Sequence, residues 1–234
     1  MLTIANAIPA AAIKFIVFDL DGTLIDSRRD LAVSVNAMLE EMGRPTLPEN
    51  VVAEYVGDGA GMLVRRVLGD PVDEAVITEG VERFLKCYRE HMLDYTYVYD
   101  GVFAALDALR ASPDGAARKF AVLTNKPINP SRKICDVLGL SRYFFQIYGG
   151  NSFGTKKPDP EGLRALMREA GAGPGETLMI GDSVVDVLAA RSAKTHVIGC
   201  RYGLSSHTLE TIVSDCMVDA PSEWTMALSD GVHQ

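Results

Sequence analysis

The stretch Phe18-Asp19-Leu20-Asp21-Gly22-Thr23-Leu24-Ile25 decides how this sequence is interpreted. It follows the short apolar run at residues 13–18, which is typical of a buried parallel strand. Open α/β sheets bind ligands at the carboxyl ends of such strands, where Asp19 and Asp21 come. Because two carboxylates this close repel each other, the pair favours a metal site or a carboxylate nucleophile over a solvated Asp-Gly turn.

Size and composition describe an ordinary globular protein. The chain of 234 residues is long enough for one large domain or two smaller ones. Its residues are 47% hydrophobic and 23% charged, which is typical of a globular protein. The formal net charge of −8 disfavours nucleic acid and anionic membranes as partners. Four cysteines without Cys-x-x-Cys spacing argue against a disulfide scaffold or a zinc site and favour free thiols in the cytoplasm. Residues 1–12 are interpreted as a loose leader, and no run is long enough to span a membrane.

Helical periodicity dominates the segment that follows the first strand. Apolar residues recur at helical spacing in 29–42 and 71–95, and shorter helices are predicted at 51–56 and 60–68. No convincing strand is found between residues 27 and 96. Because this segment has the size of a small domain, we predict a helical cap at 27–96 inserted into a core formed by 1–26 and 97–234.

The rest of the chain alternates helices with strands. Helices are predicted at 102–109, 131–138, 159–170 and 184–191, and strands at 120–123, 144–148, 177–180, 196–199 and 217–218. Such alternation implies right-handed βαβ units and a parallel sheet. The predicted fold is therefore α/β, a doubly wound parallel sheet of the Rossmann-like kind with an inserted all-helical cap domain.

Four polar clusters follow apolar segments or open helices. They are Asp19-x-Asp21-x-Thr23, Thr124-Asn125, Lys157-Pro158-Asp159-Pro160 and Gly181-Asp182-x-x-x-Asp186. Taken singly, the last three are ordinary turns, helix caps or helix entries. Because parallel strands end at the same edge of a sheet, all four clusters are expected to converge there.

The order and spacing of these clusters resemble the haloacid dehalogenase superfamily, and within it the phosphoglycolate phosphatases with a helical cap. The resemblance covers nearly the whole chain beyond residue 12. Residues 19–27, Tyr55-Val56-Gly57-Asp58-Gly59-Ala60 and Leu123-Thr124-Asn125-Lys126-Pro127 are similar to the phosphoglycolate phosphatase branch. Related sugar-phosphate phosphatases share much of this pattern.

The charges of the clusters require a cation. Asp19, Asp21, Asp182 and Asp186 bring negative charges together, whereas Lys157 supplies a single positive charge. A phosphomonoester dianion would be repelled from such a site in the absence of a divalent cation, and oxygen ligands combined with phosphate favour Mg²⁺. The sequence therefore predicts a magnesium-dependent site.

The resemblance implies roles for the four carboxylates. Asp19 attacks phosphorus and forms an aspartyl-phosphate, and Asp21 acts as general acid and then base, tuned by a neighbouring carboxylate. The carboxylates of Asp19 and Asp182 and the backbone carbonyl of Asp21 bind Mg²⁺. Asp186, one helical turn beyond Asp182, supports this metal site.

The resemblance also implies which groups hold the phosphate. The Thr124 hydroxyl and the Asn125 backbone N–H bind phosphate oxygens, and Thr23 completes the first cluster as a substrate-binding residue. A lysine ammonium balances the charge of nucleophile and phosphate. Both Lys156 and Lys157 could reach the site, and Lys157 is preferred because it directly precedes the proline.

The helical segment has two interpretations. It is either an extra domain with its own core or a lid that closes over the site, excludes water and contacts the substrate. In the second interpretation the loop Gly57-Asp58-Gly59 presents backbone groups to the substrate, although a glycine turn between helices is the plainer account. Arg65 and Arg66 follow, and an arginine would suit a substrate carboxylate, while solvation at the surface is expected for at least one of them.

The sequence thus predicts a Mg²⁺-dependent phosphoric monoester hydrolase that acts on a small phosphorylated metabolite, with 2-phosphoglycolate as the leading candidate. A sugar-phosphate phosphatase and a sugar-phosphate mutase of the same fold remain as alternatives. A non-catalytic binding module is disfavoured, because such a module need not retain Asp19, Asp21, Thr124, Lys157 and Asp182 together. A monomer or a homodimer is expected.

Overall fold

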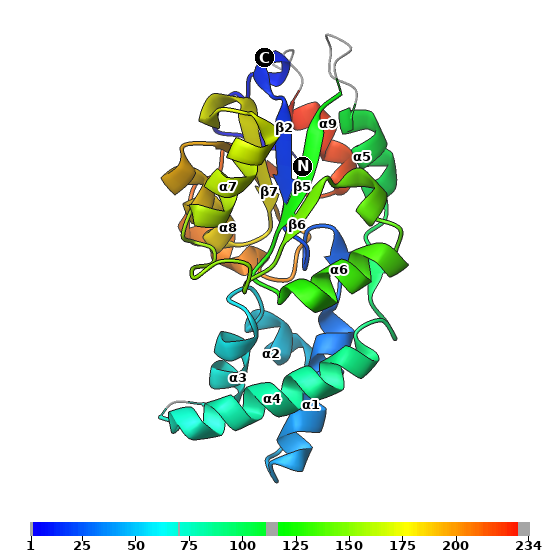
Figure 1. Ribbon diagram of the computed structural model, residues 1–234, viewed down its shortest axis with the longest axis vertical. Helices are drawn as coiled ribbons and strands as arrows, with labels where there is room; N and C mark the ends of the chain where they lie inside the picture. The colour runs from blue at the N-terminus through cyan, green and yellow to red at the C-terminus, as the bar shows by residue number, and fades with distance from the viewer. Residues whose placement is uncertain (1, 70, 111–116, 229–234) are drawn as a thin grey trace.

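The computed structural model describes residues 2–69, 71–110 and 117–228. A seven-stranded sheet has helices on both faces, and four further helices lie beyond one end of it (Figure 1). The predicted α/β class is therefore confirmed. Across the described ranges, no helix combines the length and apolarity needed to cross a membrane. All four cysteines are free thiols.

The sheet is centred on β2 (Phe15–Phe18), which is buried along its whole length. β2 pairs in parallel with β5 (Lys119–Leu123) on one side and with β7 (Thr177–Gly181) on the other. The order across the sheet is β1-β9-β8-β7-β2-β5-β6, where the remaining strands are β1 (Thr3–Ile4), β6 (Gln146–Tyr148), β8 (His196–Cys200) and β9 (Cys216–Val218). The chain proceeds outward from β2 in both directions, so the end of β2 is the topological switch point at which such sheets bind ligands.

Alternate strand residues point to opposite faces of the sheet and bury two apolar layers. One face, which includes Phe15 and Val17, packs against α7 (Glu161–Ala170) and α8 (Val184–Ala193). The other face, which includes Ile16 and Phe18, packs against α5 (Val102–Arg110), α6 (Ile128–Val137) and α9 (Trp224–Ala227). Figure 1 shows the two helix layers on either side of the sheet, as in a doubly wound architecture.

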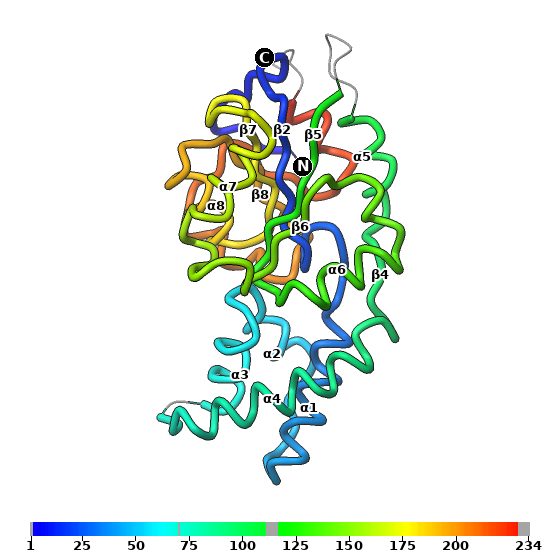
Figure 2. The backbone as a smooth tube through the Cα atoms, in the orientation of Figure 1, coloured from blue at the N-terminus to red at the C-terminus, as the bar shows by residue number. Residues whose placement is uncertain are grey.

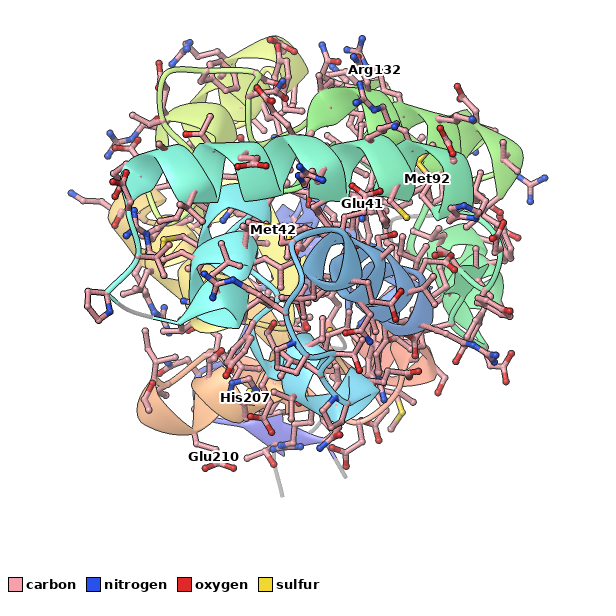
Figure 3. The ribbon with its side chains drawn as sticks, turned by 90° about the horizontal axis from the view of Figure 1, so that it is seen from below. Glu41, Met42, Met92, Arg132, His207 and Glu210 are labelled. Atoms are coloured by element: carbon pink, nitrogen blue, oxygen red, sulfur yellow. The ribbon has the colours of Figure 1, made fainter. Side chains whose placement is uncertain are left out.

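The four helices beyond the sheet are α1 (Arg28–Glu41), α2 (Glu49–Glu54), α3 (Ala60–Leu68) and α4 (Glu74–His91). Seen from below, α4 lies across the view, with Met92 beyond its C-terminal end and Met42 at the end of α1 (Figure 3). α4 begins later than the predicted helix because Asp73 caps its start by accepting a hydrogen bond from the Ala75 N–H, and it ends at His91, before the predicted end at residue 95. Short 3₁₀ turns complete the fold at Ala10–Ala12, Ser141–Tyr143, Pro174–Glu176, Ser206–Thr211 and Pro221–Glu223.

The two connections between these helices and the sheet lie side by side. The short strand β3 (Ile25–Asp26) pairs antiparallel with β4 (Tyr97–Val98), and Figure 2 follows the chain through both segments. The buried carboxylate of Asp30, in the first turn of α1, accepts hydrogen bonds from the backbone N–H groups of Tyr95 and Thr96 and from the Thr96 hydroxyl, at 2.6–3.1 Å. The segment that leads from the main sheet to α1 and the segment that returns from α4 are therefore held next to each other.

The prediction of a loose leader at residues 1–12 was wrong. β1 pairs antiparallel with β9, and Ile8 and Ala10 are buried in the core, while residue 1 lies outside the described residues. The sheet is consequently not wholly parallel, because β1 forms an antiparallel edge. A strand of two residues carries no periodicity that could reveal it, and its place at the edge covers β9, which would otherwise expose unpaired backbone groups.

Candidate active site

The predicted clusters meet at the carboxyl end of the sheet, on the side that faces α1–α4. Asp19 directly follows β2, Thr124 directly follows β5, and Asp182 directly follows β7, just before α8. All three are buried, with at most 7% of their surface exposed. Parallel strands of matched register end together, so residues far apart in the sequence come into contact here.

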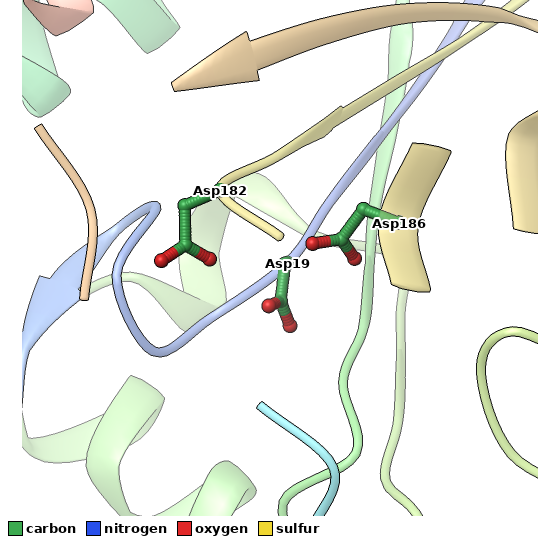
Figure 4. A group of neighbouring side chains, drawn as sticks. All are labelled: Asp19, Asp182 and Asp186. Atoms are coloured by element: carbon green, nitrogen blue, oxygen red, sulfur yellow. The ribbon is translucent and has the colours of Figure 1, made fainter. Parts of the chain in front are cut away.

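Three carboxylates form the centre of the site (Figure 4). Asp19, Asp182 and Asp186 each offer an oxygen, and these oxygens lie within 4.8 Å of one another. Burial raises the pKa of Asp19 to about 6, with Lys157 opposing and Asp186 adding to the rise. Burial and the charges of Asp19 and Asp186 raise the pKa of Asp182 well above its usual value. The charged forms of Asp19 and Asp182 are therefore disfavoured, and a bound divalent cation would stabilise them.

Asp182 and Asp186 are held by local hydrogen bonds. The Ser205 N–H donates to Asp182 Oδ2 at 2.9 Å. Ser183 precedes α8 and donates from its N–H and its hydroxyl to Asp186 Oδ2, at 3.1 and 2.6 Å. This capping arrangement at the start of α8 orients Asp186 toward the other two carboxylates.

Lys157 supplies the positive charge of the cluster. Its Nζ lies 2.8 Å from Asp19 Oδ1 and 2.6 Å from Asp186 Oδ1, and the side chain is 1% exposed. Burial alone would lower the pKa of Lys157, but Asp186 and Asp19 outweigh it and raise that pKa to about 12. Lys156 instead donates to the backbone carbonyl of Asp58 at 2.5 Å. The structure thus places Lys157, rather than Lys156, beside Asp19.

Gly22 and Gly203 have no side chains, and this leaves room for Asp182. A Cβ at Gly22 would lie 2.0 Å from Asp182 Oδ2, and a Cβ at Gly203 would lie 2.2 Å from the Asp182 Cβ. Gly22 also has a φ of +83°, which glycine adopts without strain. Neither position can carry a larger residue unless Asp182 moves.

Gly203→Ala is therefore expected to displace Asp182, lower divalent-cation affinity and reduce kcat/KM, since a misplacement of about 1 Å can cost about 10²-fold. Titration with MgCl₂ and steady-state hydrolysis measure both effects. Gly175→Ala is the matched control, because a Cβ there would meet nothing within 4 Å. Wild-type affinity and rate in Gly203→Ala would show that the position of Asp182 is not critical.

Asp21 is held by a different pair of residues. The Ser27 hydroxyl donates to Asp21 Oδ1 at 2.6 Å, and Lys126 Nζ lies 3.0 Å from both carboxylate oxygens. The charged group in contact with Asp21 is thus an ammonium, and the influence of a neighbouring carboxylate on Asp21 stays a prediction. Lys126 was given no role from the sequence, although a lysine directly after the Thr124-Asn125 cluster is a signal that could have found it.

A cavity lies between the sheet edge and the four helices. Its sheet side is polar and includes Asp19, Asp21, Thr124, Asn125 and Lys126. Its helical side is mostly apolar, and its side chains include Leu31, Val56, Leu63, Phe84, Leu85 and Tyr88. A ligand at Asp19 would therefore be enclosed by both parts of the molecule.

The loop between α2 and α3 contacts this cavity. Gly57 and Gly59 line it, and the Gly57 carbonyl accepts a hydrogen bond from Asn125 Nδ2 at 3.0 Å. Asp58 is not among the lining residues, and its side chain forms an ion pair with Arg66. The loop thus joins the helices to the sheet edge, and contact between the substrate and Gly57, Asp58 or Gly59 stays a prediction.

Three other predicted contacts are not seen at the cavity. The Thr23 side chain is fully buried away from the lining, and its carbonyl accepts a hydrogen bond from the Tyr202 hydroxyl at 2.9 Å. Neither Arg65 nor Arg66 lines the cavity, and Arg65 forms an ion pair with Glu74. A role for any of the three in binding substrate is therefore still only a prediction.

Comparison with known proteins gives consistent matches. A family model described as haloacid dehalogenase-like hydrolase matches residues 16–200, which include every cluster above. A phosphoglycolate phosphatase of Pseudomonas syringae pv. tomato is 41% identical over 195 residues, covering 81% of this chain and 70% of that protein. A phosphoglycolate phosphatase of Chromobacterium violaceum is 36% identical over 223 residues, covering 94% of this chain and 98% of that protein.

A solved structure shows the same fold over nearly the whole chain. It is described as a predicted phosphoglycolate phosphatase from Haemophilus somnus 129pt and has a TM-score of 0.84 at 30% sequence identity. The match covers 93% of this chain and 99% of that one, so it extends over the helices α1–α4 as well as over the sheet.

Proposed function

The chain is a phosphatase of the haloacid dehalogenase-like hydrolase family, and on that premise we propose that it hydrolyses 2-phosphoglycolate with Mg²⁺ through an aspartyl-phosphate on Asp19. The observation that carries this proposal is the buried Asp19 carboxylate at the end of the central strand, in contact with Lys157 and next to two further acids. The choice of 2-phosphoglycolate is supported by the names of relatives that are 36–41% identical.

The acidic cluster fits Mg²⁺. Asp19, Asp182 and Asp186 offer only oxygen donors, which hard cations prefer. Burial raises the pKa values of Asp19 and Asp182, neighbouring carboxylates add to the rise, and a cation would offset this repulsion. The Asp21 carbonyl is a further proposed ligand. Bound there, Mg²⁺ would polarise the phosphoryl oxygens and offset their charge. Asp186 already accepts hydrogen bonds on both of its oxygens, which suits a supporting role.

In the proposed first step the Asp19 carboxylate attacks phosphorus. A bond forms between an Asp19 oxygen and phosphorus while the bond from phosphorus to the ester oxygen breaks, and the leaving oxygen takes a proton from Asp21. Both carboxyl groups line the same cavity. Lys157 holds Asp19 in place and offsets the charge that would otherwise repel the phosphoryl group, and Thr124 with the Asn125 N–H binds phosphoryl oxygens.

In the proposed second step Asp21, now a carboxylate, removes a proton from a water molecule that attacks phosphorus. The bond between phosphorus and Asp19 breaks, which releases inorganic phosphate and restores both carboxyl groups. The apolar wall formed by α1, α3 and α4 keeps other water away from the intermediate.

Phosphate release from a panel of phosphorylated metabolites tests this function. We expect Mg²⁺-dependent release, abolished by EDTA, with the highest kcat/KM for 2-phosphoglycolate. A sugar phosphate as the best substrate would overturn the substrate assignment and leave the phosphatase standing. Isomerised sugar phosphate without net release of phosphate would instead identify a mutase.

Mg²⁺ is expected to stabilise the folded protein more at about pH 7 than at about pH 5. The pKa of Asp19 is raised from 3.8 to about 6 in the metal-free folded state. Between pH 3.8 and about 6, Asp19 therefore keeps its proton in the folded state and loses it in the unfolded state. The free energy of unfolding without metal consequently falls as pH rises through this window. Because Mg²⁺ competes with that proton, its stabilising effect grows over the same window.

Thermal unfolding with and without MgCl₂, at both pH values, measures this effect. The control is Asp182→Ala, which should reduce the stabilisation at each pH. An equal shift of Tm at the two pH values would contradict metal binding at Asp19.

We also propose that residues 27–96 form a cap on a catalytic core of residues 1–26 and 97–234. Three features support this division: the pairing of β3 with β4, the hydrogen bonds from the Tyr95 and Thr96 N–H groups to Asp30, and the cavity between the two parts. Native-state hydrogen exchange tests it. The amides of α1–α4 should open together at a free energy different from that of β2, β5 and β7. One common opening free energy for all of them would contradict the division.

A further inference from the structure

Two side chains from opposite sides of the cavity meet beside Asp21. Lys126 comes from the sheet edge and Tyr88 from α4, and they are only 6% and 2% exposed. Lys126 Nζ lies 4.5 Å from the centre of the Tyr88 ring and 3.0 Å from the Asp21 oxygens. Both side chains line the cavity, although neither has a role in the two steps described above.

The Tyr88 hydroxyl is a buried donor that finds no acceptor among the described residues. Such a group destabilises a folded protein unless a ligand or water occupies the place it faces. Burial above all raises the pKa of Tyr88 to about 12, so the hydroxyl keeps its proton at neutral pH. Tyr88 can therefore donate a hydrogen bond into the cavity.

Lys126 brings a positive charge to the same place. Burial would lower the pKa of Lys126, but Asp21 and Tyr88 outweigh it and raise that pKa above its usual value. The neighbouring wall, which includes Leu31, Leu63 and Phe84, is apolar, and these side chains provide neither a positive charge nor a hydrogen-bond donor for an anion. An anionic group in this part of the cavity would therefore be attracted to Lys126 and Tyr88.

The position of Asp21 indicates which part of a substrate would lie beside Lys126 and Tyr88. As the proposed general acid, Asp21 must lie within about 3 Å of the leaving oxygen. Lys126 contacts Asp21 directly, so a group attached to the carbon that carries the leaving oxygen would come close to Lys126. A carboxylate on that carbon has two acceptor oxygens, which match one ammonium and one hydroxyl donor.

We propose that Lys126 and Tyr88 form a subsite for a carboxylate carried by the carbon next to the leaving oxygen. The substrate class is then the phosphate esters of 2-hydroxy acids. This inference rests on the proposed function, because it names the groups that would recognise the carboxylate of 2-phosphoglycolate. It also assigns to Lys126 and Tyr88 the contact that was predicted for Arg65 or Arg66, which lie outside the cavity lining.

The test compares two esters with the same carbon skeleton, 2-phosphoglycolate and 2-hydroxyethyl phosphate. The second replaces the carboxylate with a neutral CH₂OH group and keeps an alkoxide leaving group. We expect wild-type protein to prefer 2-phosphoglycolate. Tyr88→Phe, which keeps the ring and removes the donor, should reduce the ratio of the two kcat/KM values by about 10- to 100-fold, the range for a hydrogen bond to a charged group.

Tyr99→Phe is the matched control. The Tyr99 hydroxyl is also buried and has no hydrogen-bond partner among the described residues, but Tyr99 does not line the cavity. Its removal should leave the ratio at the wild-type value. Lys126→Met should reduce the ratio as Tyr88→Phe does, and it should also slow the hydrolysis of both esters because Asp21 loses its ion-pair partner.

An unchanged ratio of the two kcat/KM values in Tyr88→Phe would overturn the subsite. Equal losses of kcat/KM for both esters in Tyr88→Phe and Lys126→Met would also overturn it, because they would show that the two side chains only support Asp21. Calorimetric binding of the two esters to Asp19→Asn protein gives the same comparison without turnover. The subsite can thus be judged even if the proposed reaction through Asp19 fails. Equal affinity for the two esters would overturn the carboxylate subsite alone.

Discussion

Asp19→Asn should abolish turnover while the protein stays folded. The substitution removes the proposed nucleophile and keeps the shape of the side chain. Loss of a catalytic nucleophile is expected to reduce kcat by about 10⁴-fold or more. The fold should tolerate the change, because burial disfavours the charged form of Asp19 and Lys157 keeps its contact with Asp186.

Hydrolysis of p-nitrophenyl phosphate and of 2-phosphoglycolate measures the loss, and circular dichroism with thermal unfolding checks the fold. Asp94→Asn is the matched control, since Asp94 is an exposed carboxylate that pairs with His91 and does not line the cavity at Asp19. Substantial residual turnover in pure Asp19→Asn protein would remove Asp19 from the role of nucleophile.

Asp21→Asn should slow both the formation and the breakdown of the aspartyl-phosphate, because an amide can neither give nor take the required proton. General acid–base catalysis contributes about 10²–10⁴-fold. The loss should depend on the leaving group. The p-nitrophenolate ion needs little protonation, so phosphorylation by p-nitrophenyl phosphate should be affected less than phosphorylation by 2-phosphoglycolate.

Single-turnover measurements of the phosphorylation step with both substrates test this difference. Ser27→Ala is the control, because it removes a hydrogen bond to Asp21 and leaves the carboxyl group present. Its effect should be similar for the two leaving groups. The same loss for both substrates in Asp21→Asn would exclude Asp21 as the acid.

Long apolar runs and strong periodicity made most of the fold predictable. The run before Asp19 is buried on both faces of the sheet, and it could therefore be recognised as a central strand. Helices such as α3 were found because their apolar residues repeat at helical spacing. The strands β1, β3 and β4 have two residues each, and only their distant partners identify them as strands.

The candidate site was predictable where its residues stand next to strands. The Asp19, Thr124 and Asp182 clusters each follow an apolar run, and the geometry of a parallel sheet then brings them together. Tyr88 could not be found in this way, because on α4 it continues an ordinary apolar stripe with Phe84. Gly203 was also missed, since its importance depends on the distance between its backbone and Asp182 in three dimensions.

The antiparallel pair β3–β4 has a consequence for how this protein could change in evolution. Ile25 lies opposite Val98, so the segment between the two strands is a loop whose ends are already closed. The entropy of closing a loop grows only with the logarithm of its length, and each doubling costs about 0.6 kcal/mol. Helices could thus be added to or lost from this segment at little cost to the sheet, and a new residue at the position of Tyr88 could alter substrate choice while Asp19 and Lys157 stay unchanged.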